Sequence, residues 1–290
     1  MSQPHCEAPT NSTGSAKNKQ NHRELWPYGN YRSYYSFRPG STGAPAVTAD
    51  APNSLDGRLS LLDPALFRGR TLLDIGTNSG KIALDAFECL GAARVVGVDI
   101  DPLLIDDCWA AAAARGLKDG DPRVDFLQGN IMLDGWFERF QVEMRTRAAA
   151  SASSGSGAPR IKDERPVAEP TADGSRAVEP PPAARFDVVT LFSITKWLHL
   201  HHGDEGMLRL FSSLYTFLPV GGIVIIEPQE WDNYKRAVKR NKDLRDVFKR
   251  IELRPPFERE MEAAGFVLEK HIEREEGGFS RPLLVWRKER

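Results

Sequence analysis

Short apolar runs alternate along this chain with longer stretches that have helical spacing. Five runs have the length and apolar character of buried strands, at 71–75, 94–100, 124–130, 186–192 and 221–228. Helical spacing is present at 79–91, 101–116, 205–218, 231–251 and 257–265. Two closing runs, 266–274 and 280–288, predict a pair of strands. Such alternation predicts an α/β fold with a mostly parallel, seven-stranded sheet covered by helices on both faces.

Two stretches lack this pattern. Residues 1–25 are polar and without periodicity, which predicts a disordered tail. Residues from about 141 to 185 contain no aromatic side chain and are rich in Ala, Pro, Gly and Ser, which indicates a flexible insert. Three predicted strands precede the insert and four follow it. Because one sheet needs both groups, we expect a single domain over 26–290.

Composition narrows the class of protein. The 290 residues carry a formal net charge of −1, so bulk electrostatics does not indicate a nucleic-acid binder. The three cysteines (Cys6, Cys89 and Cys108) are scattered, which argues against a disulfide framework and against structural zinc. No apolar run approaches the length of a membrane span, about 18 residues, and the N-terminus has no apolar signal core. We expect a soluble intracellular protein.

The stretch "LLDIGTNSG" (72–80) is the best local motif. Asp74 ends the first strand, Gly76 and Gly80 flank a turn into a helix, and Asp99 ends the second strand. A carboxylate at the latter place can accept hydrogen bonds from both ribose hydroxyls. Asn78 stands where a dinucleotide-binding motif has its middle glycine, which disfavours NAD. The pattern resembles class I (Rossmann-like) S-adenosylmethionine-dependent methyltransferases, although an ordinary strand–turn–helix would also have a glycine turn.

The stretch "SITKWLHLHHGDEG" (193–206) follows the fourth strand. Its histidines, His199, His201 and His202, lack a fourth ligand and the helical H-E-x-x-H spacing, so we expect no metal. Asp204 fits a helix N-cap, and the region from His201 to Gly206 then reads as a helix entrance. Lys196 and His199 precede that cap. Since ligands bind beyond the carboxyl ends of the strands, both are candidates for catalysis or phosphate binding.

Two further stretches combine aromatic and charged residues. "YGNYRSYYSFR" (28–38) interleaves tyrosine and arginine, which suits base stacking and phosphate contact but also suits a lid packed on the domain. "EPQEWDNY" (227–234) follows the fifth strand, where the alternative is simple loop packing. The next helix has eight Lys or Arg against three Asp between 231 and 250, either as a solvated face or as an RNA-tracking surface.

Taken in order, these motifs identify a family. "NYRSYYSFR", "DGRL", "FRGR", "LLDIGTNSG", "SITKWLHLHHGDEG", "EPQEW" and "GFSRP" resemble the methylphosphate capping enzymes, the Bicoid-interacting-3-type RNA methyltransferases. The resemblance covers 26–290 apart from the insert. It implies a class I methyltransferase fold and methylation of the γ-phosphate of a 5′-triphosphate on small non-coding RNA. A sister branch methylates 5′-monophosphate ends, and some members also act as RNA-bound assembly factors.

The resemblance also implies roles for individual residues. The cofactor, S-adenosylmethionine, would contact Tyr35, Arg58, Asp74, Gly76, Thr77, Asn78, Asp99, Ile100, Asn130, Ile131 and Phe192. The catalytic group around the RNA phosphates would be Tyr34, Arg38, Lys196 and His199. The substrate RNA would further contact Glu227, Gln229, Trp231 and Arg281. The chain departs from the family at Thr77, where Cys is usual, and at Glu230, where Pro is usual.

Lys196 and the paired tyrosines favour the triphosphate branch, so the expected activity is RNA 5′-γ-phosphate methylation. Three alternatives stay open: a 5′-monophosphate methyltransferase, a mainly non-catalytic small-RNA assembly factor, and a small-molecule methyltransferase. A phosphate nucleophile is already anionic near neutral pH, because its second pKa is about 6, and therefore needs alignment more than a strong base. The resemblance implies a nuclear protein, with the cytoplasm as the alternative. We expect a monomer, without metal or membrane, that binds RNA and candidate ribonucleoprotein partners.

Overall fold

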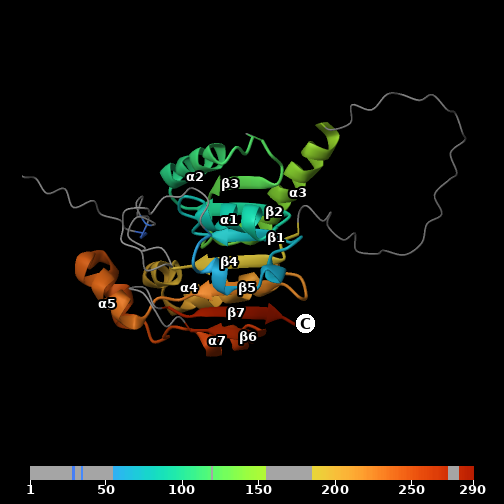
Figure 1. The fold of residues 1–290 in the computed structure, drawn as a ribbon. Coiled ribbons are helices and arrows are strands. Elements are labelled where there is room, and N and C mark those ends of the chain that lie inside the picture. The colour runs from blue at the N-terminus through green and yellow to red at the C-terminus, as the bar shows by residue number, and fades with distance from the viewer. Residues whose placement is uncertain (1–27, 30–33, 35–54, 119, 155–184, 274–280) are drawn as a thin grey trace, which may run out of the picture.

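The computed structural model describes residues 28, 29, 34, 55–118, 120–154, 185–273 and 281–290 (Figure 1). Tyr35, Arg38 and the tail 1–25 lie outside the described residues, as do 155–184 of the predicted insert.

One seven-stranded sheet runs through the described part of the chain, in the order β3-β2-β1-β4-β5-β7-β6. The strands are β1 (Thr71–Ile75), β2 (Arg94–Asp99), β3 (Val124–Gln128), β4 (Val188–Phe192), β5 (Ile223–Glu227), β6 (Phe266–Ile272) and β7 (Leu283–Lys288). The first five are parallel, whereas β7 runs antiparallel to both β5 and β6. This arrangement confirms the expected class I methyltransferase fold.

The central strands are buried along their whole length, which explains their continuous apolar sequences. Helices cover both faces of the sheet (Figure 1). Successive residues of a strand point to opposite faces and so meet opposite helix layers. Leu72 packs on the side of α1 (Lys81–Cys89) and α2 (Pro102–Ala114). Leu73 packs on the side of α3 (Trp136–Ser154), α4 (Thr195–Phe217) and α7 (Glu258–Ala263). The sheet therefore lies between two apolar cores.

A third apolar cluster lies beside the carboxyl ends of the strands. It packs α5 (Trp231–Arg240), the 3₁₀ turn η5 (Lys242–Leu244) and α6 (Arg245–Arg250) on the first half of α4. Trp197, Leu200 and Tyr234 form its buried centre. Two further 3₁₀ turns, η2 (Leu59–Leu61) and η3 (Pro64–Leu66), precede β1.

The structure corrects three predicted boundaries. Helix α4 begins at Thr195 and not at 205, and Gly203 kinks it with φ 65° and ψ −170°. The predicted helix 231–251 is broken after Arg240, where Asn241 has an extended backbone and caps η5 through its side chain. Helix α3 continues through the start of the predicted insert to Ser154. Its alanines are strong helix formers, which explains why the helix extends into this stretch.

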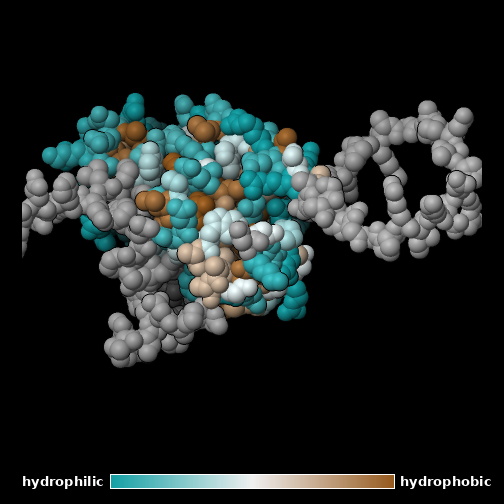
Figure 2. Space-filling model, turned by 90° about the horizontal axis from the view of Figure 1, so that it is seen from above, coloured by the Kyte–Doolittle hydropathy of each residue, from teal (hydrophilic) through white to brown (hydrophobic). Residues whose placement is uncertain are grey.

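The surface of the described residues is mostly hydrophilic in the view of Figure 2, with apolar residues scattered over it. The most exposed large apolar side chains belong to separate elements and include Leu103, Leu133 and Val220. In the described part of the chain, every helix is too short or too polar to cross a bilayer. Cys89 and Cys108 are free thiols.

Candidate active site

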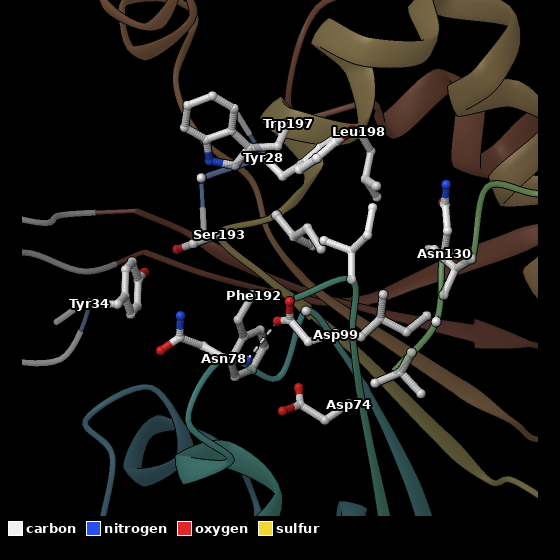
Figure 3. Close-up of a pocket in the computed structure, with 18 of the residues that line it drawn as sticks. Tyr28, Tyr34, Asp74, Asn78, Asp99, Asn130, Phe192, Ser193, Trp197 and Leu198 are labelled. Atoms are coloured by element: carbon white, nitrogen blue, oxygen red, sulfur yellow. Dashed lines mark hydrogen bonds between the residues drawn. The ribbon is translucent and has the colours of Figure 1, made fainter. Parts of the chain in front are cut away.

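A pocket opens at the carboxyl ends of β1, β2 and β4 and is covered by the first turns of α4 (Figure 3). This is where ligands bind in doubly wound sheets. Most of the predicted cofactor residues line it, namely Arg58, Asp74, Gly76, Asn78, Asp99, Ile100, Asn130, Ile131 and Phe192, and Tyr34 lies at the same opening. Thr77 is buried and does not line the pocket.

The turn after β1 is shaped by close packing. Gly76 has φ 72°, and a Cβ at this position would lie 2.3 Å from Cδ1 of Ile194. Its N–H donates to the carbonyl of Val98 at 2.8 Å. Only glycine tolerates both the positive φ and the approach of Ile194, so the β1–α1 turn and the start of α4 meet across the pocket floor.

Two buried carboxylates face the pocket (Figure 3). Asp99 accepts hydrogen bonds from the backbone N–H groups of Asn78, at 3.0 Å, and Asp101, at 3.1 Å. Burial nevertheless raises the pKa of Asp99 to about 6. Burial also raises the pKa of Asp74, although Thr190 Oγ1 donates to its Oδ1 at 2.6 Å.

These groups fit S-adenosylmethionine. Asp74 Oδ2 is buried and receives no hydrogen bond within the described part of the chain. A ligand ammonium would supply the missing donor and offset the cost of burying this acid. Asp99, at the end of β2, is placed to accept hydrogen bonds from ribose hydroxyls, and Asn130 and Ile131 form the wall beyond it.

Arg58 is held within the protein and is 1% exposed. Its guanidinium makes a bidentate contact with Asp56 at 2.8 and 3.0 Å, and its Nη1 reaches Oε2 of Glu227 at 3.2 Å. The predicted contact of Arg58 with the cofactor stays a prediction. The structure places the residue in the pocket wall with most of its fork already engaged.

The residues predicted for the RNA side differ in exposure. Glu227 is completely buried and Gln229 is 2% exposed, and both bond to protein groups at the β4–α4 junction. The ring of Trp231 stacks on that of Phe248, with ring centroids 5.0 Å apart. Cζ of Arg254 lies 3.9 Å from the centroid of the Trp231 ring. Trp231 is half-buried, and its predicted contact with the RNA stays a prediction. Arg281 is 9% exposed, and its Nη1 donates to the hydroxyl of the pocket-lining Ser193 at 2.8 Å.

Lys196 lies on the first turn of α4, next to the pocket-lining Trp197. Its Nζ is 4.3 Å from the centroid of the Trp197 ring. Burial of the ammonium lowers the pKa of Lys196 to about 7, with further lowering by the positive charges of Arg281 and Arg240. Lys196 thus lies among other positive charges, those of Arg281 and Arg240. Such a cluster of cations favours the binding of an anionic ligand.

His199 does not reach the pocket. It is completely buried; its Nε2 lies 2.7 Å from Oδ1 of Asp204, and its Nδ1 lies 3.3 Å from the hydroxyl of Tyr234. Burial lowers the pKa of this imidazole. Asp204 does not cap a helix start as predicted, since its carboxylate also accepts from the backbone of Glu252 and Leu253. Its place just after the kink explains the difference.

Several pocket residues escaped the sequence analysis. One face of α4 lines the pocket with Ile194, Trp197, Leu198, His201 and His202. These positions follow helical spacing (i, i+3, i+4, i+7, i+8), a signal that was hidden while the helix was expected to begin at 205. On the outer side, the ring of Tyr28 lies 4.7 Å from that of His201, and Gly29 packs against Trp197. Within the described residues, no group of three or more His, Cys, Asp or Glu could hold a metal ion.

Comparison with known proteins decides the family. The model of the Bicoid-interacting protein 3 (Bin3) family matches residues 186–288. The U6 snRNA methylphosphate capping enzyme Amus of Drosophila melanogaster is 30% identical over 288 residues, covering 94% of this chain and 79% of the relative. The chain belongs to the Bin3 family.

Other relatives of this Bin3-family chain differ in length and name. The mouse 7SK snRNA methylphosphate capping enzyme is 32% identical over 79% of this chain, which spans only 34% of that protein. The bovine RNA 5′-monophosphate methyltransferase is 27% identical over 75% of this chain and 63% of the relative. Among solved structures, the N-methyltransferase NodS from Bradyrhizobium japonicum has a TM-score of 0.45 and 10% identity, over 80% of this chain and 93% of that one.

Proposed function

We propose that this protein transfers a methyl group from S-adenosylmethionine to the γ-phosphate at the 5′-triphosphate end of a small non-coding RNA. Membership of the Bin3 family supports an RNA methyltransferase, and relatives named for 7SK and U6 snRNA capping support the substrate class. The observation that carries the proposal is a pair of cations at the edge of the cofactor pocket: Lys196 precedes the pocket-lining Trp197, and Arg281 donates to the pocket-lining Ser193 at 2.8 Å.

The proposed cofactor site uses the groups described above. Asp99 accepts hydrogen bonds from the ribose hydroxyls, Asp74 faces the ammonium, and the turn from Gly76 to Asn78 approaches the ligand with its backbone. Asn130 and Ile131 border the adenine. When bound, S-adenosylmethionine supplies an electrophilic methyl group on a sulfonium.

The residues of the chain then have to align an acceptor that is already anionic. Lys196 and Arg281 hold non-attacking phosphate oxygens, because neutralising the attacking oxygen would weaken it as a nucleophile. A phosphate dianion near Lys196 raises the pKa of this lysine from about 7, so substrate binding itself favours the ammonium. With both ring nitrogens engaged, His199 holds α4 in place and is not assigned a proton-transfer role.

The second candidate is methylation of a 5′-monophosphate, for which the bovine relative is named. A triphosphate carries more charge than a monophosphate, and two clustered cations match it better. One RNA prepared with a 5′-triphosphate, 5′-monophosphate or 5′-hydroxyl end and incubated with labelled S-adenosylmethionine separates these functions. The proposal expects transfer to the triphosphate. Transfer only to the monophosphate would overturn it, and tight RNA binding without transfer would favour an assembly factor.

We further propose that the protein acts in the nucleus, as the small nuclear RNAs in the names of its relatives suggest. Ribonucleoprotein partners and a monomeric state stay predictions. Imaging of the tagged full chain in cells tests the nuclear localisation, and that proposal fails if the protein is confined to the cytoplasm.

A further inference from the structure

Ser193 joins β4 to α4 in a left-handed backbone conformation, with φ 60°. A residue with a Cβ adopts this conformation only where its surroundings enforce it. All its polar groups are bonded to other elements. Its N–H donates to the carbonyl of Glu227 at 3.1 Å, its hydroxyl donates to Glu227 Oε2, and its carbonyl accepts from Nε2 of Gln229. The same hydroxyl accepts from Nη1 of Arg281 at 2.8 Å.

Gln229 performs a second task at the same junction. The N-cap residue of α4, Ile194, offers no side-chain hydrogen bond to the free N–H groups of the first turn. Gln229 supplies it from another element, since its Oε1 accepts from the backbone N–H of Lys196 at 3.0 Å and from the hydroxyl of Thr195 at 3.1 Å. Gln229 is 2% exposed, so water competes little for these hydrogen bonds.

The two side chains together connect both cations of the proposed phosphate site. Arg281 is oriented through the hydroxyl of Ser193, and the backbone of Lys196 is fixed through Gln229. Ser193 also lines the cofactor pocket. Glu227, on the buried side of Ser193, is balanced by Arg58 at 3.2 Å. The position of the cations relative to the cofactor pocket therefore depends on one small, part-buried set of hydrogen bonds.

We propose that Ser193 and Gln229 are positioning residues that set Lys196 and Arg281 against the cofactor pocket for methyl transfer. This inference rests on the proposed function. Neither residue needs to touch the transferred methyl group. Both act by fixing where the phosphate is held, and a displacement of about 1 Å at a reacting centre can cost about 10²-fold in rate.

The test uses Ser193→Ala, which removes the hydroxyl but keeps the Cβ, and Gln229→Met, which keeps the approximate side-chain length without the amide. Ser212→Ala, an exposed serine on α4, is the matched control. The measurements are kcat and KM with triphosphate RNA, the ratio of kcat/KM for triphosphate over monophosphate RNA, the calorimetric Kd of S-adenosylmethionine, and Tm.

We expect Gln229→Met, at a residue outside the pocket lining, to keep the cofactor Kd of the control. Both variants should lose about 10²-fold in kcat and discriminate less between the two RNA ends. A purely structural role would lower Tm without changing that discrimination. Unchanged kcat and unchanged discrimination in both variants would overturn the inference, as would a loss of cofactor affinity equal to the loss of kcat. If one variant fails to fold, the other decides on the same criteria.

A binding experiment separates this inference from the proposed function. If the wild-type protein methylates none of the RNA ends, the proposed function fails. The preference of the wild type for 5′-triphosphate over 5′-hydroxyl RNA, measured by fluorescence anisotropy, then decides the positioning role. Loss of that preference in Ser193→Ala supports the role, whereas an undiminished preference, or none in the wild type, contradicts it.

Discussion

The imidazole Nε2 of His199 and the carboxylate Oδ1 of Asp204 lie 2.7 Å apart, on the two sides of the kink that Gly203 makes in α4. The same carboxylate accepts hydrogen bonds from the backbone N–H groups of Glu252, at 2.8 Å, and Leu253, at 3.3 Å. One side chain thus ties both halves of α4 to the segment after α6. This contact explains why a histidine in a catalytic-looking sequence is completely buried.

Removing the carboxylate should destabilise the protein without impairing its chemistry. Asp204→Ala leaves the buried imidazole of His199 without its partner, which costs about 1–3 kcal/mol in the free energy of unfolding. Urea denaturation measures the loss. Asp246→Ala, at an exposed aspartate that pairs with Lys249 at 3.4 Å, is the control. A fall in kcat at unchanged stability would instead assign His199 a chemical role.

Lys196→Ala should lower kcat/KM for triphosphate RNA by about 10²-fold, the scale of losing one preorganised charged contact. In the wild type, kcat/KM should fall as the pH rises through about 7, because the free enzyme then loses the Lys196 ammonium. This limb should be missing in the variant. Lys270→Ala, at an exposed lysine on β6, serves as the control. Wild-type turnover in Lys196→Ala would contradict the assignment.

Gly29→Ala tests the outer wall of the pocket. A Cβ at Gly29 would lie 1.9 Å from Nε1 of Trp197, so Tyr28 and Gly29 must move away from α4. Loss of a packed aromatic contact, about 0.5–1.5 kcal/mol, corresponds to as much as about tenfold in kcat/KM. Gly69→Ala is a matched control, with φ 71° against 72° at Gly29 and nothing within 4 Å of the added Cβ. Equal activity of the two variants would contradict a contribution of the Tyr28–Gly29 contact with α4 to the reaction.

Cofactor affinity should depend on pH through Asp99. Ribose hydroxyls donate to the ionised carboxylate, so the affinity should rise as the pH increases through about 6, the pKa of Asp99 in the free protein. Because burial raises the folded-state pKa of Asp99, its protonation increases the free energy of unfolding as the pH falls below about 6. Titration of Asp99 therefore does not cause unfolding in this range. Calorimetry with S-adenosylhomocysteine should give a Kd that depends on pH in the wild type. In Asp99→Asn, binding should be weaker and its Kd should not depend on pH. Asp106→Asn, on the exposed side of α2, should behave like the wild type.

The sequence predicted the sheet well because its central strands are buried on both faces. β1, β4 and β5 read as apolar runs, and the carboxylates at the ends of β1 and β2 mark the pocket. The start of α4 could not be predicted in the same way. Its first turn is capped by Gln229 from another element and buried against Tyr234, and no local pattern reports either contact.

The candidate site was predicted in its residue types more than in its geometry. Lys196 and His199 look equivalent in the sequence, yet one lies next to the pocket wall and the other is completely buried. His201 and His202 line the pocket because they share the helical face of Trp197, which becomes evident only once α4 is known to begin at Thr195. Buried hydrogen bonds such as those of Glu227 and Gln229 depend on tertiary contacts across more than 30 residues.

The most direct test of the central claim asks which phosphate carries the methyl group. RNA with a radiolabelled γ-phosphate is incubated with the protein and S-adenosylmethionine and then treated with alkaline phosphatase. A methylated γ-phosphate is a diester-like end that the phosphatase does not remove, so the account predicts label retained on the RNA, and label released from a reaction without cofactor. Complete release of the label despite methyl transfer to the RNA would contradict γ-phosphate methylation.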